Sequence, residues 1–149
     1  MAIEFSRFKD GGQGDLISEQ RLNAVSGYAM YVGQALKVSG GALIYAQSSD
    51  IVYAISNVSA ASSVVTASYK PEVFPVNDNQ VWKASIGSAI TAAFVPGSYA
   101  GFATSVELGT SIAGDVVNNS AMYVFNIATA STPSTSAAYV IFPNPVSRA

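Results

Sequence analysis

From Ala35 onward the sequence consists of short runs of β-branched and aromatic residues separated by turn residues. The run "ALKVS" (35–39) is followed by "GG", then by "ALIYA" (42–46) and, after "QSSD", by "IVYAIS" (51–56). Two such runs joined by Gly-Gly are typical of a β-hairpin. Strands this short, at spacings of about ten residues, indicate antiparallel β-structure rather than parallel βαβ units.

Further runs of the same kind follow toward the C-terminal end. The sequence predicts strands over 64–70, 72–76, 80–86, 90–95, 102–108, 115–117, 122–128 and 138–142, and one helical turn over 57–63. The chain of 149 residues is long enough to bury one hydrophobic core without disulfide or metal cross-links. We therefore expect a single, mainly β domain built as an antiparallel barrel or sandwich.

The first 15 residues read differently from the strands. Apolar Ile3, Phe5 and Phe8 alternate with charged residues, and the segment ends in the glycine-rich "GGQGD". Such a segment has too few apolar residues to form a stable structure by itself. We expect a flexible arm with a glycine hinge over 1–15, followed by the β-rich domain over 16–149.

Residues 16–32 are the best helix candidate in the sequence. Ser18 is a suitable N-cap, and Leu22 and Val25 fall on one face of a helix. Gly27 weakens this prediction because glycine disfavours a helix interior. The expected domain thus carries one or two short helices beside its strands.

The residue types that are missing exclude several function classes. The chain has no cysteine and no histidine, so disulfides, thiolate or imidazole metal sites and histidine or cysteine catalysis are not available. The net charge of −2 and the lack of a Lys/Arg cluster argue against nucleic-acid binding. Polar and glycine residues interrupt the apolar stretches before they reach the roughly 18 residues of a membrane span. We expect no metal, no cofactor, no membrane segment and synthesis in the cytoplasm.

Charged residues are concentrated at the start of the chain. Eight of them lie between Glu4 and Lys37, whereas 84–106 and 116–147 contain none. An apolar fraction of 50% with so few charges indicates that neighbouring subunits cover part of the surface.

The single tryptophan follows a turn rich in asparagine. In "EVFPVNDNQVWKASI" (72–86), Pro75 confines the first strand to a sheet edge or a bulge, because proline cannot donate to a ladder. The "NDNQ" segment is expected to turn the chain back as an edge hairpin. Trp82 and Ala84 share the apolar face of the return strand. We expect Trp82 to anchor the core, with an interface role as the alternative, and we assign Phe74 and Pro75 the same two alternatives.

Carboxylates and tyrosines are the remaining candidates for functional residues. Paired carboxylates can hydrolyse glycosides without histidine, but the aspartates of the β-region lie in turn contexts, where they cap their own backbone. We expect no enzyme, and Glu107 with Asp115 is the pair that an enzymatic alternative would use. The eight tyrosines suit core packing and protein interfaces equally well.

The order of the segments resembles that of a known protein class. An N-terminal arm precedes "VGQALKVSGGALIYAQSSDIVYAIS", "SYKPEVFPVNDNQVWKASIG", "VELGTSIAGDVV", "MYVFNIA" and "AYVIFP". This layout is similar to that of the capsid decoration, or cement, proteins of tailed double-stranded DNA bacteriophages, the group of the phage lambda head-stabilising protein. The similarity covers 33–142 and rests on short glycine-based motifs of the type G-x-x-x-K-V-x-G-G-x-L. The Ser/Thr loop at 128–138 has no counterpart.

The resemblance implies a β-tulip-like module that forms homotrimers on the outer surface of the expanded head. The partner would be the major capsid protein, and the arm residues Ile3, Phe5, Arg7 and Phe8 are candidates for binding it. An arm of this kind can add a strand to an exposed sheet edge. The alternative outside this class is a tail or adhesin module that binds host glycans through its tyrosines.

Overall fold

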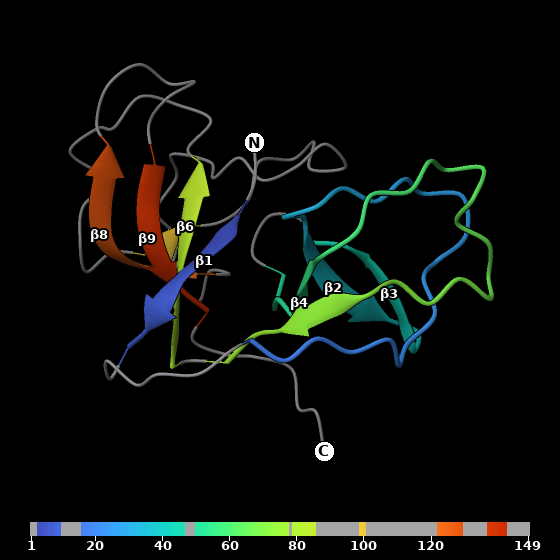
Figure 1. Ribbon diagram of the computed structural model, residues 1–149, viewed down its shortest axis with the longest axis horizontal. Helices are drawn as coiled ribbons and strands as arrows, with labels where there is room; N and C mark the ends of the chain where they lie inside the picture. The colour runs from blue at the N-terminus through green and yellow to red at the C-terminus, as the bar shows by residue number, and fades with distance from the viewer. Residues whose placement is uncertain are drawn as a thin grey trace.

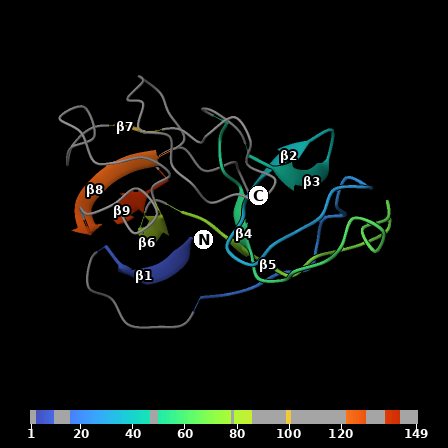
Figure 2. The same cartoon turned by 90° about the horizontal axis from the view of Figure 1, so that it is seen from above.

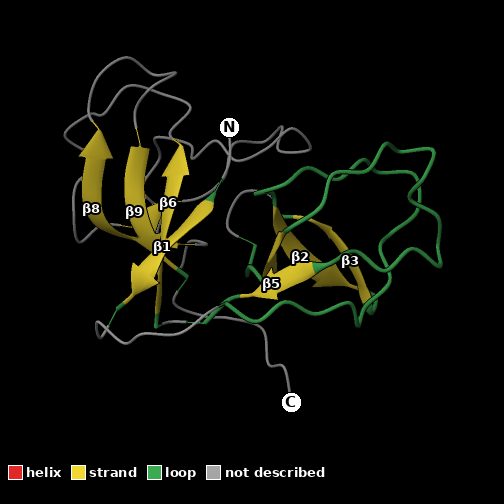
Figure 3. Cartoon of the chain, viewed as in Figure 1, coloured by secondary structure: helices red, strands yellow, loops and turns green. Residues whose placement is uncertain are grey.

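The computed structural model describes residues 3–9, 16–46, 50–77, 79–85, 99–100, 122–129 and 137–142. These residues form two antiparallel sheets and contain no helix (Figure 3). The strands are β1 Glu4–Phe8, β2 Ala35–Ser39, β3 Ala42–Tyr45, β4 Ala54–Ser56, β5 Val73–Pro75, β6 Gln80–Ser85, β7 Tyr99–Ala100, β8 Met122–Thr129 and β9 Ala137–Ile141. The predicted mainly β, antiparallel class is confirmed.

The two sheets lie side by side along the long axis of the molecule (Figures 1 and 2). One has the strand order β1-β6-β9-β8-β7, and the other has the order β3-β2-β4-β5. Neither order returns to its first strand, so among the described strands there is no closed barrel. The strands predicted over 90–95, 102–108 and 115–117 lie outside the described residues.

The Gly-Gly turn forms the hairpin that the sequence predicts. Residues 35–39 pair with 42–45 in the register Ser39 to Ala42 and Lys37 to Ile44. Gly40 and Gly41 both have positive φ, 58° and 84°. Two adjacent left-handed residues are what a two-residue hairpin turn of type I′ requires, and glycine takes that conformation at no steric cost.

Each face of the four-stranded sheet packs against a core of its own. Successive side chains of a strand point to opposite faces, so Ile55 enters the core between the two sheets, whereas Ala54 enters the core on the far side. The core between the sheets also contains Trp82 of β6 and Val140 of β9. Loops 16–32 and 57–72 cover the far core with residues that include Met30. This explains why all three residues of β4 are buried.

The helix predicted over 16–32 is wrong. This segment is an irregular loop with turns at 26–27 and 32–33, and isolated bridges join Glu19 to Val73, Ala24 to Leu43 and Met30 to Ala60. Because its backbone groups bond to strand edges and to a second loop, they are not available for helical bonds. Gly27 has a φ of 87°, which a right-handed helix does not allow.

Two neighbouring predictions also differ from the structure. The helical turn expected over 57–63 lies later in the chain, over 61–65, where Val64 and Val65 donate to Ala61 O. The strand expected over 64–70 is wrong, because a further turn closes there from Tyr69 N to Thr66 O. These residues fold as part of the loop that covers the far core.

The predicted hairpin around 72–86 is wrong in its pairing. β5 pairs with β4 in one sheet, and β6 pairs with β1 and β9 in the other. The turn therefore carries the chain between sheets instead of back along its own strand. The placement of Pro75 on an edge is confirmed, because β5 ends the four-stranded sheet.

Candidate functional site

The N-terminal residues belong to the five-stranded sheet. β1 pairs with β6 in the register Glu4 to Lys83, Phe5 to Trp82, Arg7 to Val81 and Phe8 to Gln80. The register shifts between Phe5 and Arg7, which leaves Ser6 as a bulged residue. Residues 3–9 thus differ from the expected free arm, whereas the expected hinge "GGQG" (11–14) lies outside the described residues.

Apolar contacts explain why β1 finds a place in the sheet. Ile3 is buried at 2% exposure, and its N–H donates to Gly33 O at 3.1 Å. The Phe5 ring packs edge-on against Trp82, with the centroids 5.6 Å apart. The Arg7 guanidinium lies 5.5 Å from the Tyr139 ring centroid. Arg7 is exposed and Phe8 is half-buried.

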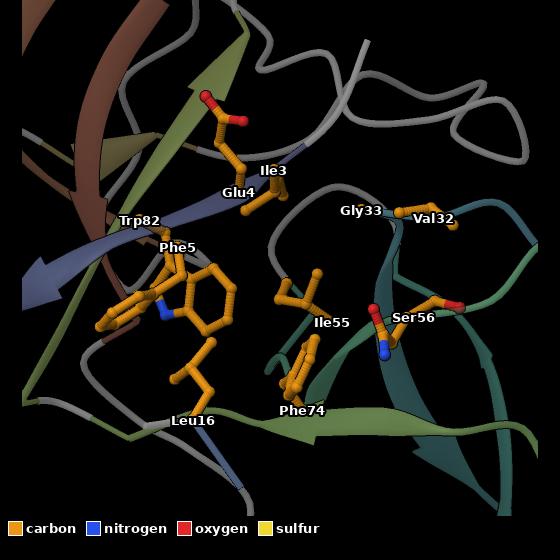
Figure 4. Close-up of a pocket in the computed structure, with 11 residues that line it drawn as sticks. Ile3, Glu4, Phe5, Leu16, Val32, Gly33, Ile55, Ser56, Phe74 and Trp82 are labelled. Atoms are coloured by element: carbon orange, nitrogen blue, oxygen red, sulfur yellow. The ribbon is translucent and has the colours of Figure 1, made fainter. Parts of the chain in front are cut away.

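A pocket of about 160 Å³ lies beneath β1, between the two sheets. Figure 4 shows side chains from both sheets converging on it. Four of the seven residues that the sequence singles out line this pocket: Ile3, Phe5, Phe74 and Trp82. The remaining lining residues are Glu4, Leu16, Val32, Gly33, Ile55, Ser56 and Asn57.

Trp82 forms the wall of the pocket on the β6 side. Its side chain is 1% exposed, as expected of a core anchor. Among the described residues, Trp82 Nε1 is the one buried side-chain nitrogen or oxygen that has no hydrogen-bond partner. In the close-up its nitrogen lies on the side of Leu16 (Figure 4). A buried N–H of this kind is unusual in native proteins.

The polar groups of the pocket bond within the protein. Ser56 Oγ donates to Val58 O at 2.9 Å. Asn57 Nδ2 donates to the Glu72 carboxylate. Phe74 is half-buried opposite Ile55, and Pro75 is half-buried opposite Ala54. Most of the pocket lining is therefore apolar, and the exposed Glu4 lies at its edge.

A second polar group of residues holds the 16–21 segment on the four-stranded sheet. Tyr53 Oη donates to Glu19 Oε1 at 2.5 Å and accepts from Arg21 Nη2 at 2.6 Å. Burial, and then the bond to Glu19, raises the pKa of the Tyr53 hydroxyl. The bond to Tyr53, and then the bond to Glu19, raises the pKa of Arg21. This network secures the loop on the sheet.

The two alternative functions depend on carboxylates and on tyrosines, and the structure describes only some of these residues. Glu107 and Asp115 lie outside it. Within the described part, no three acidic residues gather as a metal site. Of the tyrosines described with side chains, Tyr28 and Tyr31 are exposed, Tyr53 is buried, and Tyr45, Tyr69 and Tyr139 are half-buried. No helix there is long and apolar enough to cross a membrane.

Sequence reasoning missed Leu16, Gly33 and Ile55 as pocket residues. They come from three separate stretches of the chain and meet only because both sheets pack on one core. No local motif connects them. Comparison with protein-family models, with curated proteins and with solved structures gives no match.

Proposed function

We propose that this chain is a non-enzymatic structural protein that decorates the outside of an expanded tailed-phage head. The major capsid protein is its partner, and β1 makes the contact. The observation that carries the proposal is the position of β1 at one end of the five-stranded sheet, with β6 as its one strand partner among the described residues. The segment order that resembles decoration proteins supports the same assignment.

The contact we propose is strand addition to the outer edge of β1. In an antiparallel pair, alternate residues of an edge strand direct their backbone groups away from the partner strand. A strand of the capsid protein can use these groups and gain main-chain hydrogen bonds. This differs from a free arm, because β1 stays in its own sheet and no ordering entropy has to be overcome on binding.

The sequence of β1 favours pairing with a capsid strand over pairing with β1 of an identical chain. A bulge at Ser6 and exposed charges at Glu4 and Arg7 hinder edge-to-edge pairing between identical chains. A capsid strand with complementary charge would still pair there. Binding the assembled shell and not its separated subunits would stabilise the shell by mass action.

The homotrimer is part of the same proposal. Tyr28, Tyr31, Val32 and Val64 are exposed, and they belong to two segments joined by hydrogen bonds from Gly27 N to Val65 O and between Met30 and Ala60. An apolar surface of this kind suits a contact between subunits. Light scattering after size exclusion should give three times the chain mass of 15.4 kDa; a stable monomer would contradict the trimer.

Cosedimentation with heads assembled from the major capsid protein of the same genome tests the function. The wild-type chain should sediment with expanded heads and not with unassembled capsid subunits. No sedimentation with expanded heads would overturn the proposal.

Two variants at the bulge test the edge itself. Ser6→Pro removes a backbone N–H at a position where proline is tolerated, and Ser6→Ala keeps that N–H. Ser6→Pro should lose binding to expanded heads, whereas Ser6→Ala should bind like the wild type. Both should retain the wild-type circular dichroism and tryptophan emission. A folded Ser6→Pro that binds normally would rule out a capsid contact made through the Ser6 N–H.

A further inference from the structure

We propose that residues 19–25 form an edge clasp, which closes the outer edge of β5 to a strand from a second copy of this chain. The Glu19 side chain holds the edge clasp shut, and its release opens β5 to self-association. The inference stands on the four-stranded sheet and does not depend on the capsid proposal.

The edge clasp binds both end strands of the four-stranded sheet. At β5, Glu19 N–H donates to Val73 O at 2.8 Å, and Val73 N–H donates back to Glu19 O at 2.9 Å. At β3, Leu43 N–H donates to Asn23 O and Val25 N–H donates to Leu43 O, both at 2.8 Å. Because β3 and β5 end this sheet, one short segment of the chain occupies positions on both of its edges.

The backbone of β5 offers few groups to another strand. Val76 N–H donates inward, to Tyr53 O, so the alternation along the strand directs the backbone groups of Val73 and Pro75 to the outer edge. Proline has no N–H, and the Val73 N–H is bonded to Glu19 O. The edge clasp therefore occupies the one outward donor that β5 carries.

Side chains hold the β5 end of the edge clasp in place. Glu19 Oε1 accepts from Tyr53 Oη at 2.5 Å, and Glu19 Oε2 lies 3.1 Å from Arg21 Nε. Arg21 also donates to Tyr53 Oη. Tyr53 is 1% exposed and belongs to the far core. The Glu19 carboxylate thus ties the edge clasp to a buried residue of the domain.

A second copy of the chain is the partner that an open β5 would pair with. An uncovered edge strand is a template for pairing with another chain. Two copies whose edge clasps are open present identical edges, which can pair antiparallel about a two-fold axis. Pro75 limits this pairing because it supplies no donor, so a residue with an N–H at this position should strengthen it.

Native-state hydrogen exchange of the ¹⁵N-labelled full-length chain tests whether the edge clasp opens by itself. The Ser56 amide, which donates to Gln34 O inside the sheet, serves as the reference. The Val73 amide should exchange faster than the Ser56 amide and should respond less to low urea, because a local opening exposes little surface. Equal rates and equal urea dependence of the two amides would overturn the proposal.

Two variants identify what holds the edge clasp. Glu19→Ala should accelerate exchange of the Val73 amide at least about fivefold, the factor that a typical net hydrogen bond gives. Lys37→Ala removes the ion pair between Lys37 and Asp50 of the same sheet and should leave Val73 exchange unchanged. Unchanged exchange in Glu19→Ala, or equal acceleration in both variants, would contradict the role of Glu19.

Self-association tests what the edge clasp prevents. The double variant Glu19→Ala/Pro75→Val frees Val73 and restores an outward N–H at position 75. It should form assemblies larger than the wild type that bind thioflavin T, measured by light scattering and fluorescence. Pro75→Val alone and Lys37→Ala/Pro75→Val should keep the wild-type size. A folded double variant of wild-type size, or the same assemblies in Lys37→Ala/Pro75→Val, would overturn the proposal. The exchange measurements keep it falsifiable if the double variant does not fold.

Discussion

Phe5 and Trp82 lie directly opposite each other in the β1–β6 ladder, and their rings meet edge to face at an interplanar angle of 78°. This contact joins the N-terminal strand to the core between the sheets. It also forms one wall of the pocket. The stability of the domain and the position of β1 should therefore be coupled through these two residues.

Substitutions of both rings should reveal this coupling. Trp82→Ala removes a fully buried side chain and should cost about 3–5 kcal/mol of unfolding free energy. Phe5→Ala should cost less because Phe5 is half-buried. The double variant should fall short of the sum by about 0.5–1.5 kcal/mol, the usual energy of an aromatic pair. Urea unfolding of the four proteins measures this cycle, and strict additivity would mean that the rings do not interact.

The Gly-Gly turn should tolerate only residues that accept left-handed backbone. At Gly41, φ is 84° and nothing lies within 4 Å of an added Cβ, so a substitution acts through the backbone alone. Gly41→Ala should destabilise the protein by about 1–2 kcal/mol. Gly41→Asn should cost less, because asparagine visits this region more readily. Equal losses in thermal or urea unfolding would contradict the type I′ turn.

Tyr53 should make stability sensitive to alkaline pH. Burial raises the pKa of its hydroxyl in the folded state, so its contribution is complete below the unfolded value of about 10 and is lost as the pH rises through the folded value. Tyr53→Phe should cost about 1 kcal/mol near neutral pH, since Glu19 and Arg21 each lose a partner.

The difference between wild type and Tyr53→Phe should then shrink as the pH rises above about 10. Urea unfolding at several pH values measures it, with both proteins in the same buffers so that the other tyrosines cancel. A difference that stays constant across the alkaline range would mean that Tyr53 is not buried against Glu19.

The parts of the fold that could be predicted are those with a local signal. Gly40 and Gly41 specify a turn by themselves, and the alternation around Trp82 identifies its buried face. The segment 16–32 carried a helical pattern, but bonds to Val73, Leu43 and Ala60 outweigh it. Such bonds join distant parts of the chain, and no local pattern reports them.

Contacts between distant parts of the chain also determine the candidate site, and local sequence patterns do not reveal them. Proline and asparagine between 75 and 79 correctly signalled an edge strand and a turn, but they carry no information on which sheet receives the next strand. Phe5 and Trp82 stand out in the sequence for separate reasons. That they pair, and that Ile55 and Leu16 complete a pocket with them, follows only from the packing of the two sheets.

Hydrogen exchange of the β1 amides, residues 4–8, tests the proposed capsid contact most directly. In the free protein, amides that bond to β6 should be protected, and those directed to the outer edge should exchange rapidly. On expanded heads the outer amides should become protected as well, because a capsid strand now accepts from them. A chain that binds the heads while its outer β1 amides exchange as fast as in the free protein would contradict the account.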